Sequence, residues 1–527
     1  MAKVLITDKI NDLAVKIVQR VAEVDNLPTM DEDKLCEIIG EYDALLVRSQ
    51  TKVTARIIEA GKNLKIIGRA GVGVDNIDIP AATQKGVIVV NSPDGNTHAA
   101  AEHTIAMMMA MSRNIPLADA SVKQGLWERS KFTGVEVFNK TLGVIGLGKI
   151  GAHVANVAMA LGMKVVVFDP YANKEIVEKM GATYVEHLDD FWGLFDYLTI
   201  HTPKTKETAG LINTNTLNRM KKGVRIINCA RGGIIDEIAL AKAVESGQVA
   251  QCAIDVYEDE KNVDKSPLIN LGKNAILTPH LGASTDEAQI NVALDVANQV
   301  VEVLSGRNAT SAVNIPALKP QKLEAVKEYM SLAENIAQIA SQLSTGAIKE
   351  LNVSVSGKLS SLDVSPLEIA ILKGVLSANM VDVNYVNAPI IAKQRGIEVK
   401  TTKTNDERNT ICVSIKSSEN ETIVKGALIA KGIKRIIQFN DYSAAIEPKK
   451  YMLFVPHINR PGMVAKVASI LGADMINISG MQVAQNNIEI DKNVMVINVD
   501  SMVEEETLEK IATIDGVDKA KFISLEA

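Results

Sequence analysis

Three glycines near the middle of the chain have the spacing of a dinucleotide-binding turn. Gly146, Gly148 and Gly151 form the pattern GxGxxG in the stretch VIGLGKIGAHVANVAMALGMKVVVFDP. Glycines at these places permit a tight turn, close approach of the backbone to a pyrophosphate, and close packing of a helix on a strand. Asp169 ends the next apolar run, where a carboxylate can accept both ribose hydroxyls and repel a 2′-phosphate. We predict a site for NAD rather than NADP; a structural turn with a surface aspartate is the alternative.

Three later polar residues each follow a predicted strand and could carry out hydride transfer. Arg231, Glu260 and His280 lie in NCARGGIIDE, DVYEDE and TPHLGAST. Doubly wound sheets bind ligands at the carboxyl ends of their strands. Oxidation of a 2-hydroxy acid needs a base for the hydroxyl proton and a cation for the carboxylate, which His280 and Arg231 could supply. Glu260 could fix the tautomer of the imidazole. Their spacing alone does not unite them, so three unrelated surface residues remain the alternative.

The elements that must position these residues follow an alternating pattern. Short β-branched runs alternate with helical patterns over the first two-thirds of the chain, which predicts parallel α/β layers. The long helical stretch NTHAAAEHTIAMMMAMSRNI separates two groups of strands, so we expect two doubly wound Rossmann-like domains. The rest of the chain predicts an α+β domain and then the ferredoxin-like order βαββαβ. The expected boundaries are 1–95 plus about 287–316 for a substrate-binding domain, 96–286 for an NAD-binding domain, 317–448 for an intervening domain, and 449–527 for the last domain.

Five segments resemble the signature blocks of the D-isomer-specific 2-hydroxyacid dehydrogenases: GRAGVGVDNID, LGVIGLGKIG, INCARGGIIDE, DVYEDE and PHLGAST. The resemblance covers about residues 1–316 and implies that Arg231 binds substrate, that Glu260 is the partner of His280, and that His280 is the general acid/base. This chain has Tyr257 and Lys261 where the family commonly has Phe and Pro, which leaves Glu260 in place. The cofactor contacts that the resemblance implies are Val72, Gly146, Gly148, Lys149, Ile150, Gly151, Asp169, Thr202, Cys229, Ala230, Arg231, Asp255, His280, Gly282 and Ala283.

The segments VRSQTKVT and WERSKFTG resemble the branch of this family that oxidises D-3-phosphoglycerate. A phosphorylated hydroxy acid carries about three negative charges and needs more cations than Arg231. We expect Arg48 and Arg129, with Lys131, to bind the phosphate, although Arg129 and Lys131 could equally be surface charges. The expected contacts of the carboxylate end are Ser49, Gly71, Gly73 and Asn96. Reduction of 2-oxoglutarate occurs in some members. Another 2-hydroxyacid dehydrogenase, such as a glycerate/hydroxypyruvate reductase, and an NAD(H)-sensing corepressor-like protein are the alternatives.

The last domain, with VPHINRPGMVAKVASILGADMINISGMQV, resembles an ACT domain, a module that binds amino acids at paired interfaces. The resemblance implies that His457, Asn459 and Asn477 bind L-serine as a feedback inhibitor; an inert dimerisation module is the alternative. The domain before it resembles the extra domain of long phosphoglycerate-oxidising enzymes. There, Lys393 and Arg395 could bind an anion or form a solvated basic turn.

Composition limits the other classes of function. The 527 residues carry a formal net charge of −6, which favours neither nucleic acid nor an anionic membrane. Four scattered cysteines without a CxxC pair argue against disulfides and a zinc site, so we expect no metal and a reducing compartment. With no signal-peptide core, we expect a cytoplasmic protein. We expect a homotetramer, and we expect structural or surface roles for the remaining histidines His98, His103, His153 and His187.

Overall fold

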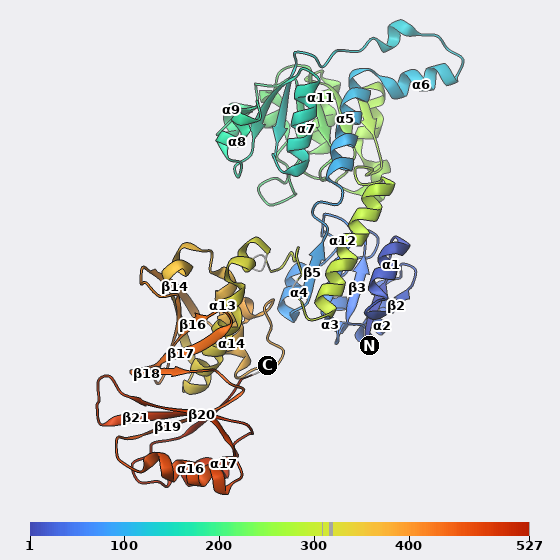
Figure 1. Cartoon of the computed structure of the whole chain (residues 1–527). Coiled ribbons are helices and arrows are strands. Elements are labelled where there is room, and N and C mark those ends of the chain that lie inside the picture. Colours follow the sequence, from blue (N-terminus) through green and yellow to red (C-terminus); the bar gives the residue numbers. More distant parts are fainter. Residues whose placement is uncertain (308, 316–319, 526–527) are drawn as a thin grey trace.

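The chain forms four β-sheets, each built from one continuous part of the sequence (Figure 1). A computed structural model describes residues 1–307, 309–315 and 320–525. The first two sheets are parallel and doubly wound, the third is mixed, and the fourth has the order βαββαβ. The predicted fold class is therefore confirmed.

The N-terminal sheet has the strand order β2-β1-β3-β4-β5 with all strands parallel. Its strands are β1 (Ala2–Ile6), β2 (Ala22–Asn26), β3 (Ala44–Val47), β4 (Ile66–Arg69) and β5 (Ile88–Asn91). Its helices are α1 (Asp12–Val18), α2 (Glu32–Ile38), η1 (Ile39–Glu41), α3 (Ala55–Ala60), α4 (Ile79–Lys85) and, from much later in the sequence, α12 (Asp286–Leu304). A Cβ on Gly68 of β4 would lie 2.6 Å from Val296 Cγ1 of α12. The close packing of α12 on this sheet therefore depends on a glycine.

The second sheet is parallel, with the order β12-β11-β10-β9-β6-β7-β8. Its strands are β6 (Thr141–Ile145), β7 (Lys164–Phe168), β8 (Thr183–Tyr184), β9 (Tyr197–Ile200), β10 (Val224–Asn228), β11 (Val249–Ile254) and β12 (Ala275–Leu277). Its helices are α5 (Thr97–Ser112), α7 (Lys149–Ala160), α8 (Lys174–Lys179), α9 (Leu188–Phe191), α10 (Thr214–Arg219), α11 (Glu237–Glu245), η3 (Glu260–Lys265) and η4 (Pro267–Asn274). The strand order reverses between β6 and β9, and ligands bind doubly wound sheets at such a switch point.

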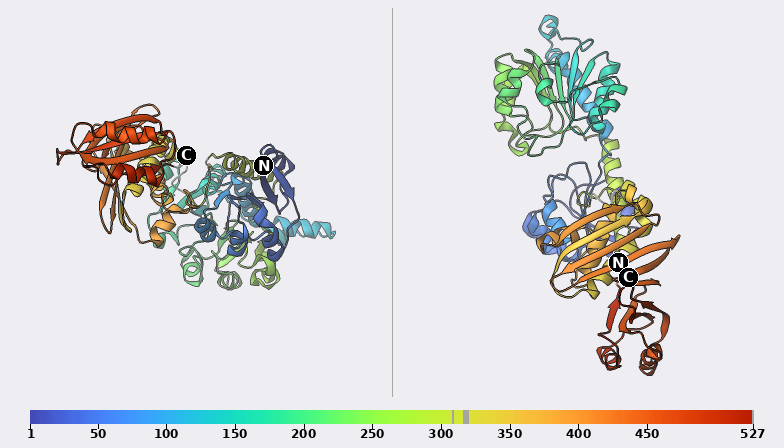
Figure 2. Two further views of the ribbon diagram at one scale, coloured as in Figure 1. Left: turned by 90° about the horizontal axis from the view of Figure 1, so that it is seen from below. Right: turned by 90° about the vertical axis from the view of Figure 1, so that its left-hand side faces the viewer.

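Two helices join these sheets, and one segment projects away from them. The chain passes from β5 to the second sheet through α5 and returns through α12, which extends between the two domains (Figures 1 and 2). Two short elements, α6 (Ile115–Lys123) and η2 (Arg129–Phe132), form an arm that extends outward from the second sheet in every view. The arm therefore lies far from the junction between the two sheets.

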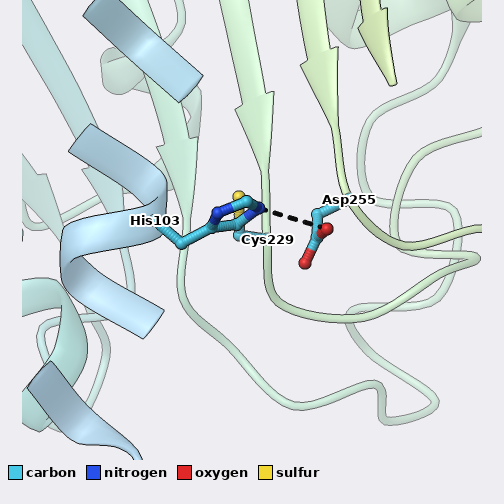
Figure 3. A group of neighbouring side chains, drawn as sticks. All are labelled: His103, Cys229 and Asp255. Atoms are coloured by element: carbon cyan, nitrogen blue, oxygen red, sulfur yellow. Dashed lines mark ion pairs between the residues drawn. The ribbon is translucent and has the colours of Figure 1, made fainter. Parts of the chain in front are cut away.

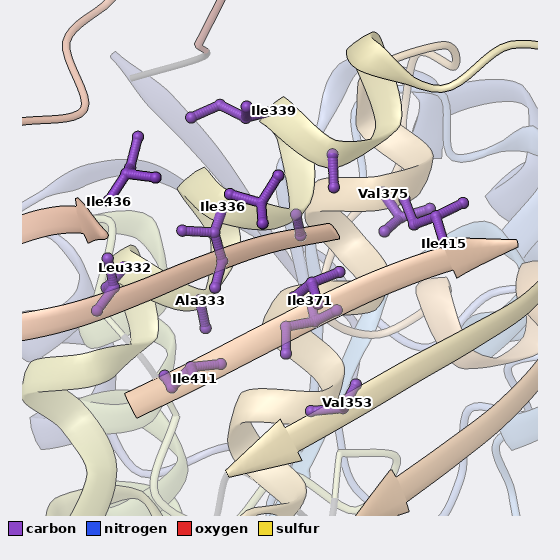
Figure 4. Packing of buried hydrophobic residues seen from close by; sticks show 14 of the residues in the cluster. Leu332, Ala333, Ile336, Ile339, Val353, Ile371, Val375, Ile411, Ile415 and Ile436 are labelled. Carbon is purple, nitrogen blue, oxygen red and sulfur yellow. The ribbon is translucent and has the colours of Figure 1, made fainter. Parts of the chain in front are cut away.

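The third sheet has the order β14-β13-β15-β16-β17-β18. Its strands are β13 (Ile348–Ser356), β14 (Glu398–Thr404), β15 (Thr410–Ser417), β16 (Glu421–Ala430), β17 (Ile433–Phe439) and β18 (Tyr442–Ile446), and its helices are α13 (Pro320–Leu343), η6 (Gly357–Ser361), α14 (Ser365–Ser377) and α15 (Ala388–Gln394). Buried side chains of α13 and α14, including Leu332, Ile336 and Ile371, pack on inward-facing Val353 and Ile411 (Figure 4). This domain thus has its own core.

The fourth sheet shares part of that core. It has the order β20-β21-β19-β22, formed by β19 (Tyr451–Ile458), β20 (Ile478–Gln485), β21 (Lys492–Val499) and β22 (Lys521–Ser524), with helices α16 (Met463–Ala473) and α17 (Glu505–Ala512). Leu453 and Val455 belong to the core under these two helices, whereas Met452 and Phe454 belong to the core of the third sheet. The rings of Phe439 and Phe454 lie 4.7 Å apart. Alternate side chains of β19 therefore link the two domains. No helix in the described ranges is long and apolar enough to cross a membrane.

We predict that Gly374→Ala loosens the contact between α13 and α14. A Cβ on Gly374 would lie 2.5 Å from the carbonyl oxygen of Glu334 and 2.9 Å from Ala337 Cβ. Overpacking costs about 1–3 kcal/mol, which exceeds the gain of about 1 kcal/mol from replacing a helical glycine. Hydrogen exchange of the α13 and α14 amides should therefore become faster. Gly472→Ala in α16 is the matched control, because its Cβ would meet no described atom within 4 Å. Exchange in α13 and α14 that is unchanged or slower in Gly374→Ala would contradict the packing argument.

Candidate active site

The glycine-rich turn between β6 and α7 has the backbone that the pattern predicts. Gly146 has a φ of +89°, and a Cβ there would lie 2.7 Å from the carbonyl oxygen of His201. A Cβ on Gly151 would lie 2.1 Å from the carbonyl oxygen of Gly146. Gly148 caps α7, and a Cβ there would meet no described atom within 4 Å. Two glycines are thus required by packing, whereas Gly148 leaves open space at a helix N-terminus, where a pyrophosphate can bind.

The acidic residue after β7 faces this turn. Asp169 accepts hydrogen bonds from the backbone N–H of Leu147 (2.7 Å) and of Tyr171 (2.8 Å). Its carboxylate is thereby held beside the glycines, where it can receive ribose hydroxyls. Thr202 Oγ1 follows β9 on the other side of the switch point, and it is buried without a hydrogen-bond partner among the described residues. An unsatisfied buried hydroxyl is a reason to expect a polar ligand there, so these residues fit NAD.

The imidazole and the carboxylate singled out by the sequence form a pair. His280 Nδ1 lies 2.8 Å from Glu260 Oε1, and both side chains are about half exposed. They line a cavity of about 380 Å³ together with Tyr257, Val263 and Ile269. Because Glu260 occupies Nδ1, the other nitrogen, Nε2, remains for proton exchange with a ligand. The arrangement is that of a general acid/base with a carboxylate that orients it.

Arg231 connects the two sheets. It follows β10, its Nη1 donates to the carbonyl oxygen of Ala230 (2.7 Å), and its Nε lies 3.3 Å from Asp75 Oδ2. Asp75 lies in the loop after β4 of the first sheet, and a Cβ on Gly73 of that loop would lie 2.3 Å from Arg231 Nη2. The guanidinium therefore reaches the backbone of the substrate-binding domain, at the place where the sequence predicts substrate contacts from Gly71 and Gly73.

Arg48 is held at this cleft by a buried carboxylate. Asp8, which is 3% exposed, accepts from the backbone N–H of Arg48 (2.6 Å) and of Thr51 (3.2 Å) and from Thr51 Oγ1 (2.6 Å). Burial alone would raise the pKa of Asp8, but hydrogen bonds from Thr51, Arg48 and Thr29 outweigh it, so the pKa lies below its usual value. Asp8 thus stays ionised and fixes the loop that carries Arg48 and Ser49.

The sequence analysis missed a third arginine in the cleft. Arg69 ends β4, its Nε is buried without a hydrogen-bond partner in the described part of the chain, and a Cβ on Gly71 would overlap its guanidinium. Burial, together with the charges of Arg231 and Arg48, lowers its pKa to about 10. These interactions place three like charges near one another. The signal in the sequence was an arginine at a strand end directly before AGVGV.

The other predicted substrate contacts lie at the start of α5 and in the projecting arm. Asn96 precedes α5, and its Oδ1 is buried with no partner in the described ranges, as expected for a residue that awaits a ligand. Arg129 and Lys131 lie on η2 in the projecting arm, where Lys131 pairs with Glu128 at 2.6 Å. Within one chain, the structure therefore does not bring Arg129 or Lys131 to Arg48 and Arg231.

Three side chains from α5 and from the ends of β10 and β11, those of His103, Cys229 and Asp255, lie close together (Figure 3). Asp255 is fully buried, and its Oδ1 lies 3.2 Å from His103 Nε2 on α5. Burial would raise the pKa of Asp255, but hydrogen bonds from His103, Thr278 and Leu281 lower it below its usual value. Burial, together with the charge of Asp255, raises the pKa of Cys229 to about 12, so its thiol stays protonated. This contact is compatible with the expected structural role of His103. The sequence did not indicate its partner, because α5 reaches Asp255 only in the folded chain.

The residues predicted to bind serine lie at two ends of the last sheet. His457 is buried and pairs in register with Asn493, and Asn459 Oδ1 accepts from Asn493 Nδ2 (3.0 Å). Asn477 Nδ2 donates to Asp500 Oδ2 (2.6 Å) beyond the other end of β21. The register places His457 and Ile478 six residues apart along β21, which corresponds to about 20 Å. One chain therefore does not form the whole predicted site. Asn493, whose Oδ1 is buried without a partner among the described residues, was missed.

Known proteins agree with this arrangement. A family model described as D-isomer specific 2-hydroxyacid dehydrogenase, NAD binding domain, matches residues 105–282, and one described as D-3-phosphoglycerate dehydrogenase intervening domain matches residues 325–440. The chain is 47% identical to a D-3-phosphoglycerate dehydrogenase of Synechocystis sp., over 100% of this chain and 95% of that protein. It is 42% identical to one of Methanocaldococcus jannaschii over 100% of both.

Among solved structures, a D-lactate dehydrogenase from Aquifex aeolicus, complexed with NAD and lactic acid, is 28% identical with a TM-score of 0.52 and covers 57% of this chain and 96% of that one. The fold and the site thus define an NAD-dependent dehydrogenase of D-isomer-specific 2-hydroxy acids. With full-length relatives at 42–47% identity, the chain belongs to the D-3-phosphoglycerate dehydrogenase family.

We predict that Gly148→Val and Gly151→Val separate cofactor binding from folding. Gly148 has an extended backbone that valine adopts readily, and its side chain would enter the open space of the turn. This variant should keep its melting temperature and bind NADH at least about tenfold more weakly, because the pyrophosphate loses its approach to the backbone. Gly151→Val should lower the melting temperature, since its Cβ would clash with Gly146. NADH fluorescence titration and calorimetry measure the two effects; unchanged NADH affinity in Gly148→Val would contradict the assignment.

Proposed function

We propose that this protein oxidises D-3-phosphoglycerate to 3-phosphohydroxypyruvate with NAD, the first step of L-serine biosynthesis. The observation that carries the proposal is that the charges of Arg48 and Arg231 both act on the buried Arg69, so that three cations gather in one region of the molecule. The His280–Glu260 pair lies in the same sheet domain as Arg231 and supplies the base. A substrate with about three negative charges matches three cations. D-glycerate, which has only a carboxylate, would leave two of them without a partner.

The residues divide the reaction among themselves. Arg231 binds the C1 carboxylate together with the backbone of Gly71 and Gly73 and with Asn96. Arg48, Ser49 and Arg69 bind the phosphate. His280 Nε2 accepts the proton of the C2 hydroxyl while the hydride leaves C2, so that a C2 carbonyl forms. Bound NAD supplies the hydride acceptor. Glu260 keeps the tautomer of His280 and stabilises the imidazolium that forms.

The same cleft supports a second reduction. 2-Oxoglutarate has a carboxylate for Arg231, a C2 carbonyl for His280, and a second carboxylate that can take the place of the phosphate at Arg48. We extend the proposal to its reduction by NADH. A glycerate/hydroxypyruvate reductase would not need Arg69, and a sensor of NAD(H) without catalysis would not need the His280–Glu260 pair. We place the activity in the cytoplasm, since the free cysteines suit a reducing compartment.

The arm supports an oligomer. Apolar side chains in and beside it are exposed, among them Ile115, Val122, Leu126, Trp127 at 80% and Phe138 at 60%. An exposed patch of this kind marks a protein interface. We propose that two arms pair across a two-fold axis and that the last domains pair across another, which gives a homotetramer. Arg129 would then reach a cleft only from a neighbouring copy.

Pairing of the last domains also explains the divided serine site. We propose that L-serine binds between two copies, with His457 and Asn459 from one copy and Asn477 from the other. A two-fold axis can bring the opposite ends of two identical sheets together. The core shared by the third and fourth sheets would then transmit the binding of serine toward the rest of the chain.

The proposed reaction predicts how activity responds to removal of the substrate phosphate and to removal of the His280 imidazole. The purified protein should form NADH with D-3-phosphoglycerate at a kcat/KM at least about 100-fold above that with D-glycerate, because two charge-assisted contacts are lost. His280→Ala should reduce kcat by about 10²–10⁴-fold, the contribution of a general base, with NADH affinity unchanged. Steady-state assays and NADH titration measure both. Equal activity on the two substrates would contradict the proposal that the arginines bind the phosphate. Full activity of His280→Ala would show that His280 is not the base.

The serine proposal predicts complementation between variants. L-serine should inhibit the natural protein, and His457→Ala and Asn477→Ala should each be insensitive. Oligomers refolded from an equal mixture of the two should regain inhibition, because some interfaces then combine an intact His457 half with an intact Asn477 half. A mixture of His457→Ala and Asn459→Ala is the control and should stay insensitive, since both changes affect the same half. Lack of inhibition in the natural protein would refute the effector; failure of the first mixture would refute a site shared between copies.

A further inference from the structure

One histidine on the connecting helix α5, His103, contacts Asp255, the carboxylate that binds the loop carrying His280. His103 Nε2 lies 3.2 Å from Asp255 Oδ1 and 3.3 Å from Thr278 Oγ1 (Figure 3). The side chain of His103 is 19% exposed and that of Asp255 is fully buried. This contact joins α5, which begins beside Asn96 at the junction of the two domains, to the carboxyl end of β11.

Asp255 in turn holds the segment that carries His280. Its Oδ1 accepts from the backbone N–H of Leu281 (2.8 Å) and from Thr278 Oγ1 (2.5 Å), and its Oδ2 accepts from the N–H of Gly282 (2.9 Å). The backbone N–H of His280 donates to the carbonyl oxygen of Asp255 (2.9 Å). Every residue from Thr278 to Gly282 except Pro279 is therefore bonded to Asp255.

The His280 backbone needs this support. Its φ of +55° lies in the left-handed region, which residues other than glycine occupy at a cost in free energy. Such a conformation persists only where neighbouring contacts impose it. A displacement of Asp255 would thus release the loop, and His280 would lose its alignment with Glu260 and with the substrate.

The same three side chains could be considered a metal site. One ligand atom each of His103, Cys229 and Asp255 lies within 4.8 Å of the others. The carboxylate of Asp255 is, however, already bonded to two backbone N–H groups and to Thr278. Burial raises the pKa of Cys229 to about 12, which opposes the thiolate that a metal requires. The hydrogen bonds therefore favour a role for His103 in holding Asp255.

We propose that His103 is a positioning residue, which holds Asp255 so that the loop from Thr278 to Gly282 presents His280 in its reactive orientation. In this proposal His103 acts through Asp255 and takes no part in the transfer of the proton or the hydride. The inference rests on the proposed oxidation by His280. It adds that the orientation of this base depends on α5, the helix through which the chain passes from the substrate-binding sheet to the NAD-binding sheet.

The test compares three full-length variants in the assay with D-3-phosphoglycerate and NAD. His103→Leu removes the donor, His103→Gln retains an amide donor at a similar reach, and His98→Leu makes the same change elsewhere on α5. His98 is exposed, and its ring lies perpendicular to that of His153 at 5.0 Å. We expect His103→Leu to lower kcat about tenfold or more, with KM for D-3-phosphoglycerate within about twofold. His103→Gln should recover most of kcat, and His98→Leu should match the natural protein.

Each other outcome overturns the inference. Unchanged kcat in His103→Leu would show that Asp255 needs no support from α5. An equal loss in His103→Gln, with both variants folded by circular dichroism, would show that size rather than a donor matters. Inhibition of the natural protein by micromolar Zn²⁺ that His103→Gln abolishes would assign the cluster to a metal. Lack of NADH formation by the natural protein would instead refute the proposed function itself.

Discussion

Repulsion among Arg48, Arg69 and Arg231 is the interaction on which the specificity of this cleft depends. The three guanidinium groups come from three strand ends, and Arg69 is buried deeply enough that its pKa falls to about 10. Asp8 and Asp75 offset part of this charge, Asp8 through the Arg48 loop and Asp75 through Arg231. Arg69 is largely buried, so its attraction for a negatively charged ligand is less screened by water than that of a surface arginine.

The domains are arranged so that this charge can be used. Parallel strands present their carboxyl ends at one edge, and α5 and α12 connect two such sheets, with Arg231 reaching across to the loop after β4. The base is supported from the same connection, because α5 carries His103 against Asp255. The two C-terminal domains are also connected through shared packing. Alternate residues of β19 belong to two cores and join the last sheet to the intervening domain.

Much of the fold could be predicted because it depends on local patterns. Alternating β-branched runs and helices identified both doubly wound sheets, and the order βαββαβ identified the last domain. GxGxxG and Asp169 predicted a turn in which packing explains Gly146 and Gly151, whereas Gly148 faces open space. Arg69 and His103 were missed because an arginine at a strand end and a histidine within a helix are ordinary in a sequence. Arg129 was grouped with Arg48 from resemblance, and the arm that carries it extends away from the cleft.

The sequence by itself determined the class of fold and the cofactor turn, and it singled out His280 as the proposed base, because each depends on residues close together along the chain or on signature segments. Only the tertiary structure decided which charges meet. Arg48 and Arg69 come together because β3 pairs with β4 in the first sheet. Arg231 follows β10 of the second sheet, so its distance from them depends on how the two sheets pack through α5 and α12. Tertiary structure also decided that His103 contacts Asp255. It likewise placed the residues that the sequence predicts to bind L-serine at two opposite ends of one sheet. Long-range packing sets such distances, and no local pattern encodes them.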